Sequence, residues 1–264
     1  MAKKSSMSKT SKRKTYGSKP RTRKAATVKL IKDVMAKEIE TKFVQQAISN
    51  TACNSEITNS DVVACLPRLV QDQGEGNAYE RLATKITPKS LKINCHVSIT
   101  PGVTRSTAVI VHYFVLTAKQ FKSYSTLPSN VNMLRLLRTG DNVQYTGFNG
   151  YVNNAFLPVN TTDFTVLKRG SFKLQKNTGI AQDDTTAGNQ PLAGQYCHSW
   201  TVNIPTPAKL IYEQDNNSPR VVYYPNNFAP FLVVGYTHQD GSSPDTLNQD
   251  ITLRHVAQMW YDDA

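Results

Sequence analysis

The stretch KSLKINCHVSIT, residues 89–100, alternates polar and apolar side chains with a period of two. Its apolar set is Leu91, Ile93, Cys95, Val97 and Ile99, and its polar set is Lys92, Asn94, His96 and Ser98. This alternation is typical of a β-strand that buries one face, because successive side chains point to opposite sides. The turn pair Pro101-Gly102 follows directly and predicts the end of the strand.

Similar patterns continue on both sides of this stretch. Residues 107–116 form a nearly continuous apolar run, which predicts a strand buried on both faces. Residues 164–174 predict a hairpin with its turn at Arg169-Gly170. Further strands are expected at residues 196–204, 220–224, 231–237 and 251–261, with prolines between them. Helical and strand spacing compete over residues 28–48, and we favour a strand at 38–46.

One short helix is predicted at residues 131–139, with Ser129 or Asn130 as its N-cap and Gly140 at its C-cap position. Eight or nine strands, long loops and little helix favour a sandwich over a closed up-and-down barrel. The 264 residues, 39% of them hydrophobic, suffice for one large all-β domain or two small domains. We therefore predict an all-β fold, a single eight-stranded jelly roll.

The charge of the chain is unevenly distributed. Of its 31 basic residues, twelve precede the first acidic residue, Asp33, so 31 − 12 = 19 remain against 19 acidic residues. The twelve are Lys3, Lys4, Lys9, Lys12, Arg13, Lys14, Lys19, Arg21, Arg23, Lys24, Lys29 and Lys32. This segment has almost no residues that form a core, which predicts disorder in the free chain. We divide the chain into a basic arm, residues 1–32, and a jelly-roll domain, residues 33–264.

A block of like charge is typical of an arm that binds a polyanion, because each cation on a phosphate releases condensed counterions. A solubilising tail is the plainer interpretation of the same composition. The runs Lys12-Arg13-Lys14 and Arg21-Thr22-Arg23-Lys24 also fit a nuclear import signal. We expect no membrane partner, since no stretch approaches the ~18 apolar residues of a span, and no apolar leader is seen at the N-terminus.

Catalytic and metal-binding patterns are not recognisable in the sequence. It contains neither Gly-x-Ser-x-Gly nor His-Glu-x-x-His. The pairs Cys95-His96 and Cys197-His198 are neighbours on predicted strands, so their side chains point to opposite faces and cannot chelate one ion. We expect no enzyme, no cofactor, no metal site and four free cysteines.

The segment from Gln73 to Ser90 resembles a recurring stretch in capsid proteins of small circular single-stranded DNA viruses that encode a replication initiator, the circovirus-like group. The matching positions are Gln73, Gly74, Gly76, Arg81, Lys85, Ile86, Lys89 and Ser90, while Ala83 replaces the usual glycine. The order of the other parts is also similar: basic arm, long apolar strand, Phe-Thr-Val-Leu…Phe-Lys-Leu segment and a C-terminal strand ending Met259-Trp260-Tyr261. An ordinary glycine loop before an ordinary strand is the plainer interpretation of the motif.

The resemblance implies a coat protein that assembles into an icosahedral shell around a circular single-stranded DNA genome. Arg81 and Lys85 are then candidates for further contacts on the interior face. The expected partners are the genome, many copies of the chain, a nuclear import receptor and an unidentified cell receptor. The expected locations are the virion and, during assembly, the host nucleus. A coat protein of a small RNA virus and a non-capsid nucleic-acid-binding protein remain open as alternatives.

Overall fold

The computed structural model describes residues 27–28, 40–71, 79–100, 108–140, 144–175, 196–213, 223–244 and 250–263. The chain divides into two units, residues 1–40 and 41–264. In the first unit the described residues are Thr27 and Val28, which are helical, and Glu40, which begins a strand. The arm predicted at residues 1–32 therefore lies almost wholly outside the described residues.

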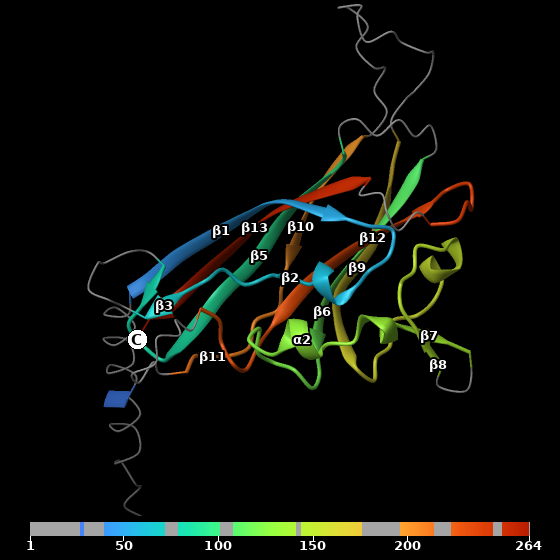
Figure 1. Cartoon of the computed structure of the whole chain (residues 1–264). Coiled ribbons are helices and arrows are strands. Elements are labelled where there is room, and N and C mark those ends of the chain that lie inside the picture. Colours follow the sequence, from blue (N-terminus) through green and yellow to red (C-terminus); the bar gives the residue numbers. More distant parts are fainter. Residues whose placement is uncertain are drawn as a thin grey trace, which may run out of the picture. The chain divides into compact units, whose positions relative to one another are not determined.

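The second unit is built from two antiparallel sheets (Figure 1). The first sheet has the order β1-β13-β5-β10, with short β11 paired to one end of β5. Its strands are β1 (Glu40–Cys53), β5 (Lys85–Ile99), β10 (Cys197–Asn203), β11 (Leu210–Ile211) and β13 (Ile251–Asp263). The second sheet has the order β2-β12-β6-β9. Its strands are β2 (Val63–Ala64), β6 (Val109–Ala118), β9 (Phe164–Leu174) and β12 (Pro230–His238).

The strand order confirms the predicted jelly roll. When the eight strands of the two main paths are numbered along the chain, the sheets read 1-8-3-6 and 2-7-4-5. Chain neighbours thus lie mostly in opposite sheets, as in two interlocked Greek keys. β11 adds a further strand to the first sheet, so the predicted count of eight is not confirmed.

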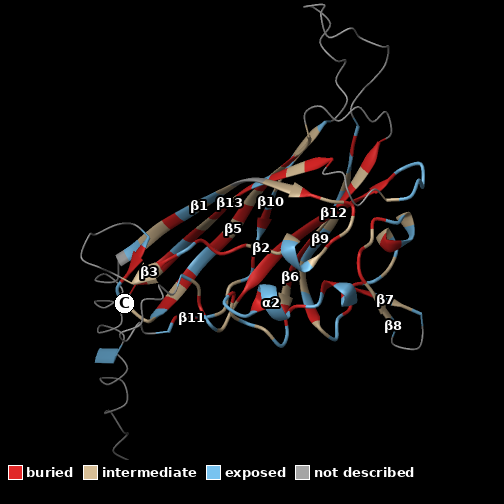
Figure 2. Ribbon diagram, in the orientation of Figure 1, coloured by how far each residue is buried: buried red, intermediate tan, exposed pale blue. Residues whose placement is uncertain are grey.

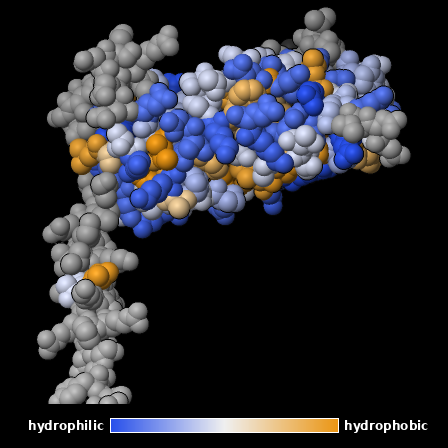
Figure 3. All heavy atoms as spheres, turned by 90° about the horizontal axis from the view of Figure 1, so that it is seen from below, coloured by the Kyte–Doolittle hydropathy of each residue, from blue (hydrophilic) through white to orange (hydrophobic). Residues whose placement is uncertain are grey.

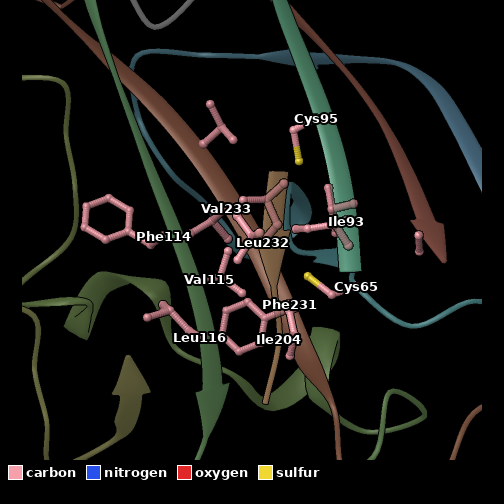
Figure 4. Close-up of a cluster of buried hydrophobic side chains, with 14 of the residues drawn as sticks. Cys65, Ile93, Cys95, Phe114, Val115, Leu116, Ile204, Phe231, Leu232 and Val233 are labelled. Atoms are coloured by element: carbon pink, nitrogen blue, oxygen red, sulfur yellow. The ribbon is translucent and has the colours of Figure 1, made fainter. Parts of the chain in front are cut away.

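The core lies between the sheets and follows the alternation of the sequence. In β5 the side chains of Leu91, Ile93, Cys95 and Val97 are buried, and the residues between them are partly exposed (Figure 2). Ile93 and Cys95 point towards the second sheet in the close-up of the core, where Val115 and Leu232 lie (Figure 4). The predicted inward set is confirmed for these four residues, and Ile99 at the strand end is only partly buried.

The outer face of the second sheet is covered by the long connection between β6 and β9, residues 119–163. Its described elements are α2 (Leu127–Asn130), the 3₁₀ turns η2 (Met133–Arg135) and η3 (Val152–Ala155), and the ribbon of β7 (Leu137–Thr139) and β8 (Gln144–Thr146). Phe148 of this connection contacts the rings of His112 and Phe114 on β6, at centroid distances of 5.3 and 6.0 Å. β12 is consequently buried along its whole length, because the first sheet covers one face and the connection the other.

The remaining short elements complete the fold at its edges. The 3₁₀ turn η1 (Asn59–Asp61) links β1 to β2, and Ile57, just before this turn, donates its N–H to the carbonyl oxygen of Phe148 at 2.8 Å. β3 (Val70–Gln71) and β4 (Glu80–Arg81) form a parallel two-stranded ribbon. Among the described residues no helix has the length and apolar character needed to cross a membrane.

Two predictions are wrong. Residues 164–174 form one continuous strand, β9, which pairs with β6 along its whole length. Gly170 is not part of a turn: it lies opposite Tyr113, and a Cβ atom there would come within 2.6 Å of the Tyr113 hydroxyl oxygen. The glycine therefore makes room for a ring that crosses the strand, and it does not reverse the chain.

The helix predicted at residues 131–139 is also wrong. α2 ends at Asn130, because Val131 adopts an extended backbone with φ −66° and ψ 138°. A 3₁₀ turn and β7 follow, and Gly140 has a positive φ of 64° in the β7–β8 connection. Apolar spacing over nine residues did not distinguish a helix from a turn followed by a strand.

The other strand predictions are mostly confirmed. The strand favoured at residues 38–46 is β1, which extends to Cys53. The strand predicted at 220–224 falls mainly outside the described residues, and Tyr223 and Tyr224 belong to no strand.

Candidate nucleic-acid interface

The two other basic residues predicted as nucleic-acid contacts, Arg81 and Lys85, lie in different surroundings. Lys85 at the start of β5 is exposed. Arg81 is fully buried, with its guanidinium 4.4 Å from the ring centroid of Tyr212. Its Nη1 donates to the carbonyl oxygen of Ala83 at 2.9 Å and its Nη2 to that of Glu213 at 3.4 Å. Arg81 thus holds chain segments together inside the fold, and we do not retain it as a contact for nucleic acid.

A buried carboxylate lies beside Arg81 at this end of the first sheet. Asp263 accepts hydrogen bonds from the backbone N–H groups of Leu82 and Ala83, at 2.7 and 3.0 Å. It also pairs with Lys42 Nζ of β1 at 3.0 Å. These bonds tie the end of β13 to β1 and to the turn after β4, so residues 81–83 of the motif are structural, whereas Lys85 stays a candidate contact. Residues 73–78 of the motif lie outside the described residues.

The charge of the jelly roll is separated between strands, although its sum is close to zero. No acidic residue occurs in β5, β6, β9 or β10. These four strands carry six cations: Lys85, Lys89, Lys92, Lys168, Arg169 and Lys173. Acidic residues occur instead in β13, which ends in Asp262 and Asp263, at Glu40 of β1, at Glu80 of β4 and in the connections. Although the net charge of the jelly roll is close to zero, the half of the sandwich formed by β5, β10, β6 and β9 has only basic charged residues on its strands.

The side of the sandwich where β9 and β10 approach each other carries a cluster of four rings, here called the edge cluster: Tyr113, Phe172, His198 and Trp200. The rings of Tyr113 and Trp200 are stacked, with centroids 4.9 Å apart. Phe172 contacts both His198, at 4.2 Å, and Trp200, at 5.1 Å. All four side chains are partly exposed. The edge cluster thus joins three strands from both sheets and reaches solvent.

The outer face of the first sheet has a different character. A row of hydrogen bonds crosses all four strands there, from Thr201 to Asn94 (2.8 Å), from Asn94 to Gln258 (3.2 Å) and from Gln258 to Gln45 (3.4 Å). A hollow of about 490 Å³ lies on this face, with Arg254 among its lining residues. The row of polar side chains is what the alternation in β5 predicts for this face. In Figure 3, which shows the molecule from below, hydrophilic residues cover most of the surface and hydrophobic residues form separate patches.

The histidines and cysteines give no sign of a reactive centre in the described part of the chain. All four cysteines are free, and burial raises the pKa of the Cys53 and Cys95 thiols to about 12. Burial also lowers the pKa of His112 to about 4, with a smaller contribution from the nearby charge of Arg169. No group of three or more His, Cys, Asp or Glu side chains is placed to hold a metal ion among the described residues.

The edge cluster is not evident from the sequence, because Tyr113, Phe172 and Trp200 occupy positions in strand patterns that are typical of core residues. Their alternation with polar residues is correct, but β9 and β10 are edge strands, so their inward side chains remain open on one side. The signal available in the sequence was the group of cations around Phe172, at Lys168, Arg169 and Lys173. Cations beside an aromatic residue are a known combination in single-stranded nucleic-acid binding.

Comparison with known proteins adds little at this level of similarity. No family model and no curated protein matches the chain. Among solved structures, the chain is similar to the empty capsid of Triatoma virus, with 10% identity and a TM-score of 0.32 over 85% of this chain and 71% of that one. It is also similar to the mavirus penton protein, with 9% identity and a TM-score of 0.17 over 84% and 99%. These scores are too low to carry an argument, so the jelly roll rests on the strand order.

Proposed function

We propose that the chain is a viral coat protein. Its jelly-roll bodies assemble into a closed shell, and its basic N-terminal arm binds the packaged genome. The observation that carries this proposal is the distribution of charge: twelve cations and no anion in residues 1–32, joined to a large all-β body. An arm of this kind binds a polyanion without reading its sequence.

The body supports the same function by its shape and its chemistry. Its two sheets bury a single core, and the long β6–β9 connection closes one outer face. The net charge of residues 33–264 is zero, which limits repulsion between copies once their arms are neutralised. Many copies can then pack side by side while their arms contact the genome.

The nature of the genome is the finer part of the proposal. The resemblance of residues 73–90 to circovirus-like capsid proteins favours circular single-stranded DNA. We further propose that the runs Lys12-Arg13-Lys14 and Arg21-Thr22-Arg23-Lys24 act as a nuclear import signal, since short clusters of Lys and Arg are typical of such signals. Digestion of the co-purified nucleic acid with DNase or with RNase distinguishes DNA from RNA directly.

Deletion of residues 1–32 tests the role of the arm. The full chain should co-purify with nucleic acid, and the truncated chain should not, as measured by the ratio of absorbance at 260 and 280 nm. For single strands the slope of log affinity against log salt should decrease by about 8, which is ~0.7 for each of the twelve lost cations. Circular dichroism of both chains provides the control for folding.

A substitution in the body serves as the matched control. Lys119, Lys122 and Arg138 are exposed on the β6–β9 connection, and their joint replacement by Ala should leave most of the salt dependence intact. Binding by the truncated chain that equals binding by the full chain at moderate salt would contradict the proposed role of the arm.

A further inference from the structure

The edge cluster and the nearby cations of β9 form a surface on the folded body. The proposed binding of the genome by the arm gives this surface no role. We propose that this surface is a second contact for single-stranded nucleic acid, in which unpaired bases stack on the edge cluster and the cations of β9 neutralise the adjacent phosphates. The inference rests on the proposed function and deepens it, because it names a site on the folded body that engages the same polyanion. With three cations on β9 against twelve in the arm, this contact is too weak to retain nucleic acid through purification when the arm is deleted.

The first argument is the construction of the edge cluster. Tyr113 lies across Gly170 of the neighbouring strand, where any side chain would collide with its ring. This glycine brings the Tyr113 ring to Trp200, so that rings from the second and the first sheet stack. Aromatic rings held in place and open to solvent are a platform for bases, and a stacked base contributes about 1–3 kcal/mol irrespective of its identity.

The second argument is charge. Lys168, Arg169 and Lys173 are exposed on β9, on either side of Phe172. Lys168 shares the face of β9 that carries Phe172, because the two are four residues apart on one strand. Arg169 and Lys173 point to the opposite face, but β9 is an edge strand, so all three cations lie along the same open edge. On the neighbouring strand of the first sheet, Lys92 of β5 pairs in register with Asn203 of β10, three residues along β10 from Trp200. β5, β6, β9 and β10 carry no acidic residue, so every charged side chain on the strands around the edge cluster is a cation.

A second copy of the chain is a less suitable occupant. Two such surfaces facing each other would bring cations against cations, which disfavours a symmetric contact. Single-stranded nucleic acid matches both the exposed aromatic rings and the basic residues of this surface. An anion without bases matches only the basic residues.

The test measures the fluorescence of Trp200 in the full-length chain. Trp260→Phe leaves Trp200 as the single tryptophan, since the chain has two. We expect oligothymidylate to quench the fluorescence of Trp200, because bases stack on the edge cluster. Inorganic polyphosphate should bind the same chain through its charge but leave the Trp200 emission unchanged, because it has no bases.

Charge reversal gives the second measurement. Lys168→Glu, Arg169→Glu and Lys173→Glu together should abolish the quenching and reduce the salt slope by about 2, from ~0.7 per contact. The matched control reverses Lys119, Lys122 and Arg138 on the β6–β9 connection, and it should retain the quenching. The comparison of oligothymidylate with polyphosphate needs neither triple variant, so misfolding of one of them leaves the test intact.

Three outcomes would overturn the inference: oligothymidylate that binds without quenching, equal loss of quenching in both triple variants, or a change in Trp200 emission on assembly without nucleic acid. The last would assign the surface to contacts between subunits. Failure here is separate from failure of the proposed function, because polyphosphate binding reports on the arm and sedimentation reports on the shell.

Discussion

The role of a single residue in the structure can differ from the role that its sequence neighbours suggest, as two residues show. Gly170 follows a basic residue and suggested a turn, yet it admits the Tyr113 ring within a continuous strand. Arg81 belongs to a motif that suggested a surface charge, yet it is buried over Tyr212. In both cases the deciding partner lies far away in the sequence, so no local pattern could have identified it.

His112 leads to a prediction about acid stability. The side chain is 7% exposed, contacts the ring of Phe148 and is hydrogen-bonded to Thr237 Oγ1 at 3.2 Å. Its pKa of about 4 in the folded chain lies below the ordinary 6.5, so the unfolded chain binds a proton more readily. The contribution of neutral His112 is complete above about pH 6.5 and is lost as the pH falls towards about 4. The difference corresponds to about 3 kcal/mol.

Urea unfolding at pH 7 and pH 4 measures this effect. Between these pH values, the free energy of unfolding should fall by about 3 kcal/mol more in the wild-type chain than in His112→Gln, which cannot take up the proton. Titration of carboxylates affects both chains and cancels in the comparison. Equal decreases in the two chains would show that His112 does not limit stability in acid.

At the scale of elements, the sequence predicted strands whose apolar residues alternate or form a continuous run. It did not predict segments in which a short turn is followed directly by a short strand. The alternation at residues 89–100 identified β5, its buried set and its polar face, because one side of the strand meets the core and the other meets solvent. The continuous apolar runs identified β6 and β12, although only the structure shows that the β6–β9 connection is what buries their second face. The turn and short strand at residues 133–139 were not predictable, since three-residue elements take their form from tertiary contacts.

Two substitutions in β5 test its orientation. Ile93 is fully buried between the sheets, so Ile93→Ala should cost roughly 2–5 kcal/mol and reduce the yield of soluble chain. His96 lies on the outer face, where its Nδ1 is 2.8 Å from Ser199 Oγ, so His96→Ala should cost about 1 kcal/mol or less. Chemical denaturation of both variants measures the difference. Similar losses in the two would mean that the face assignment of β5 is incorrect.

At the scale of the whole molecule, the sequence predicted an all-β body, a basic arm and a neutral charge balance. The jelly-roll strand order of the structure bears out the first of these. The separation of cationic strands from acidic ones was not predictable, because it depends on which strands become neighbours. The role of the arm stays a prediction, and it connects the body to the genome in the proposed coat protein.

Sedimentation velocity of the purified full-length chain, recorded at 260 and 280 nm, tests this central claim most directly. A coat protein that packages nucleic acid through its arm should sediment as one fast boundary, in which the absorbance ratio shows protein and nucleic acid together. Deleting residues 1–32 should remove the nucleic acid from any boundary that remains. A full-length chain that sediments as a monomer at high concentration, with single-stranded nucleic acid present at low salt, would contradict the account.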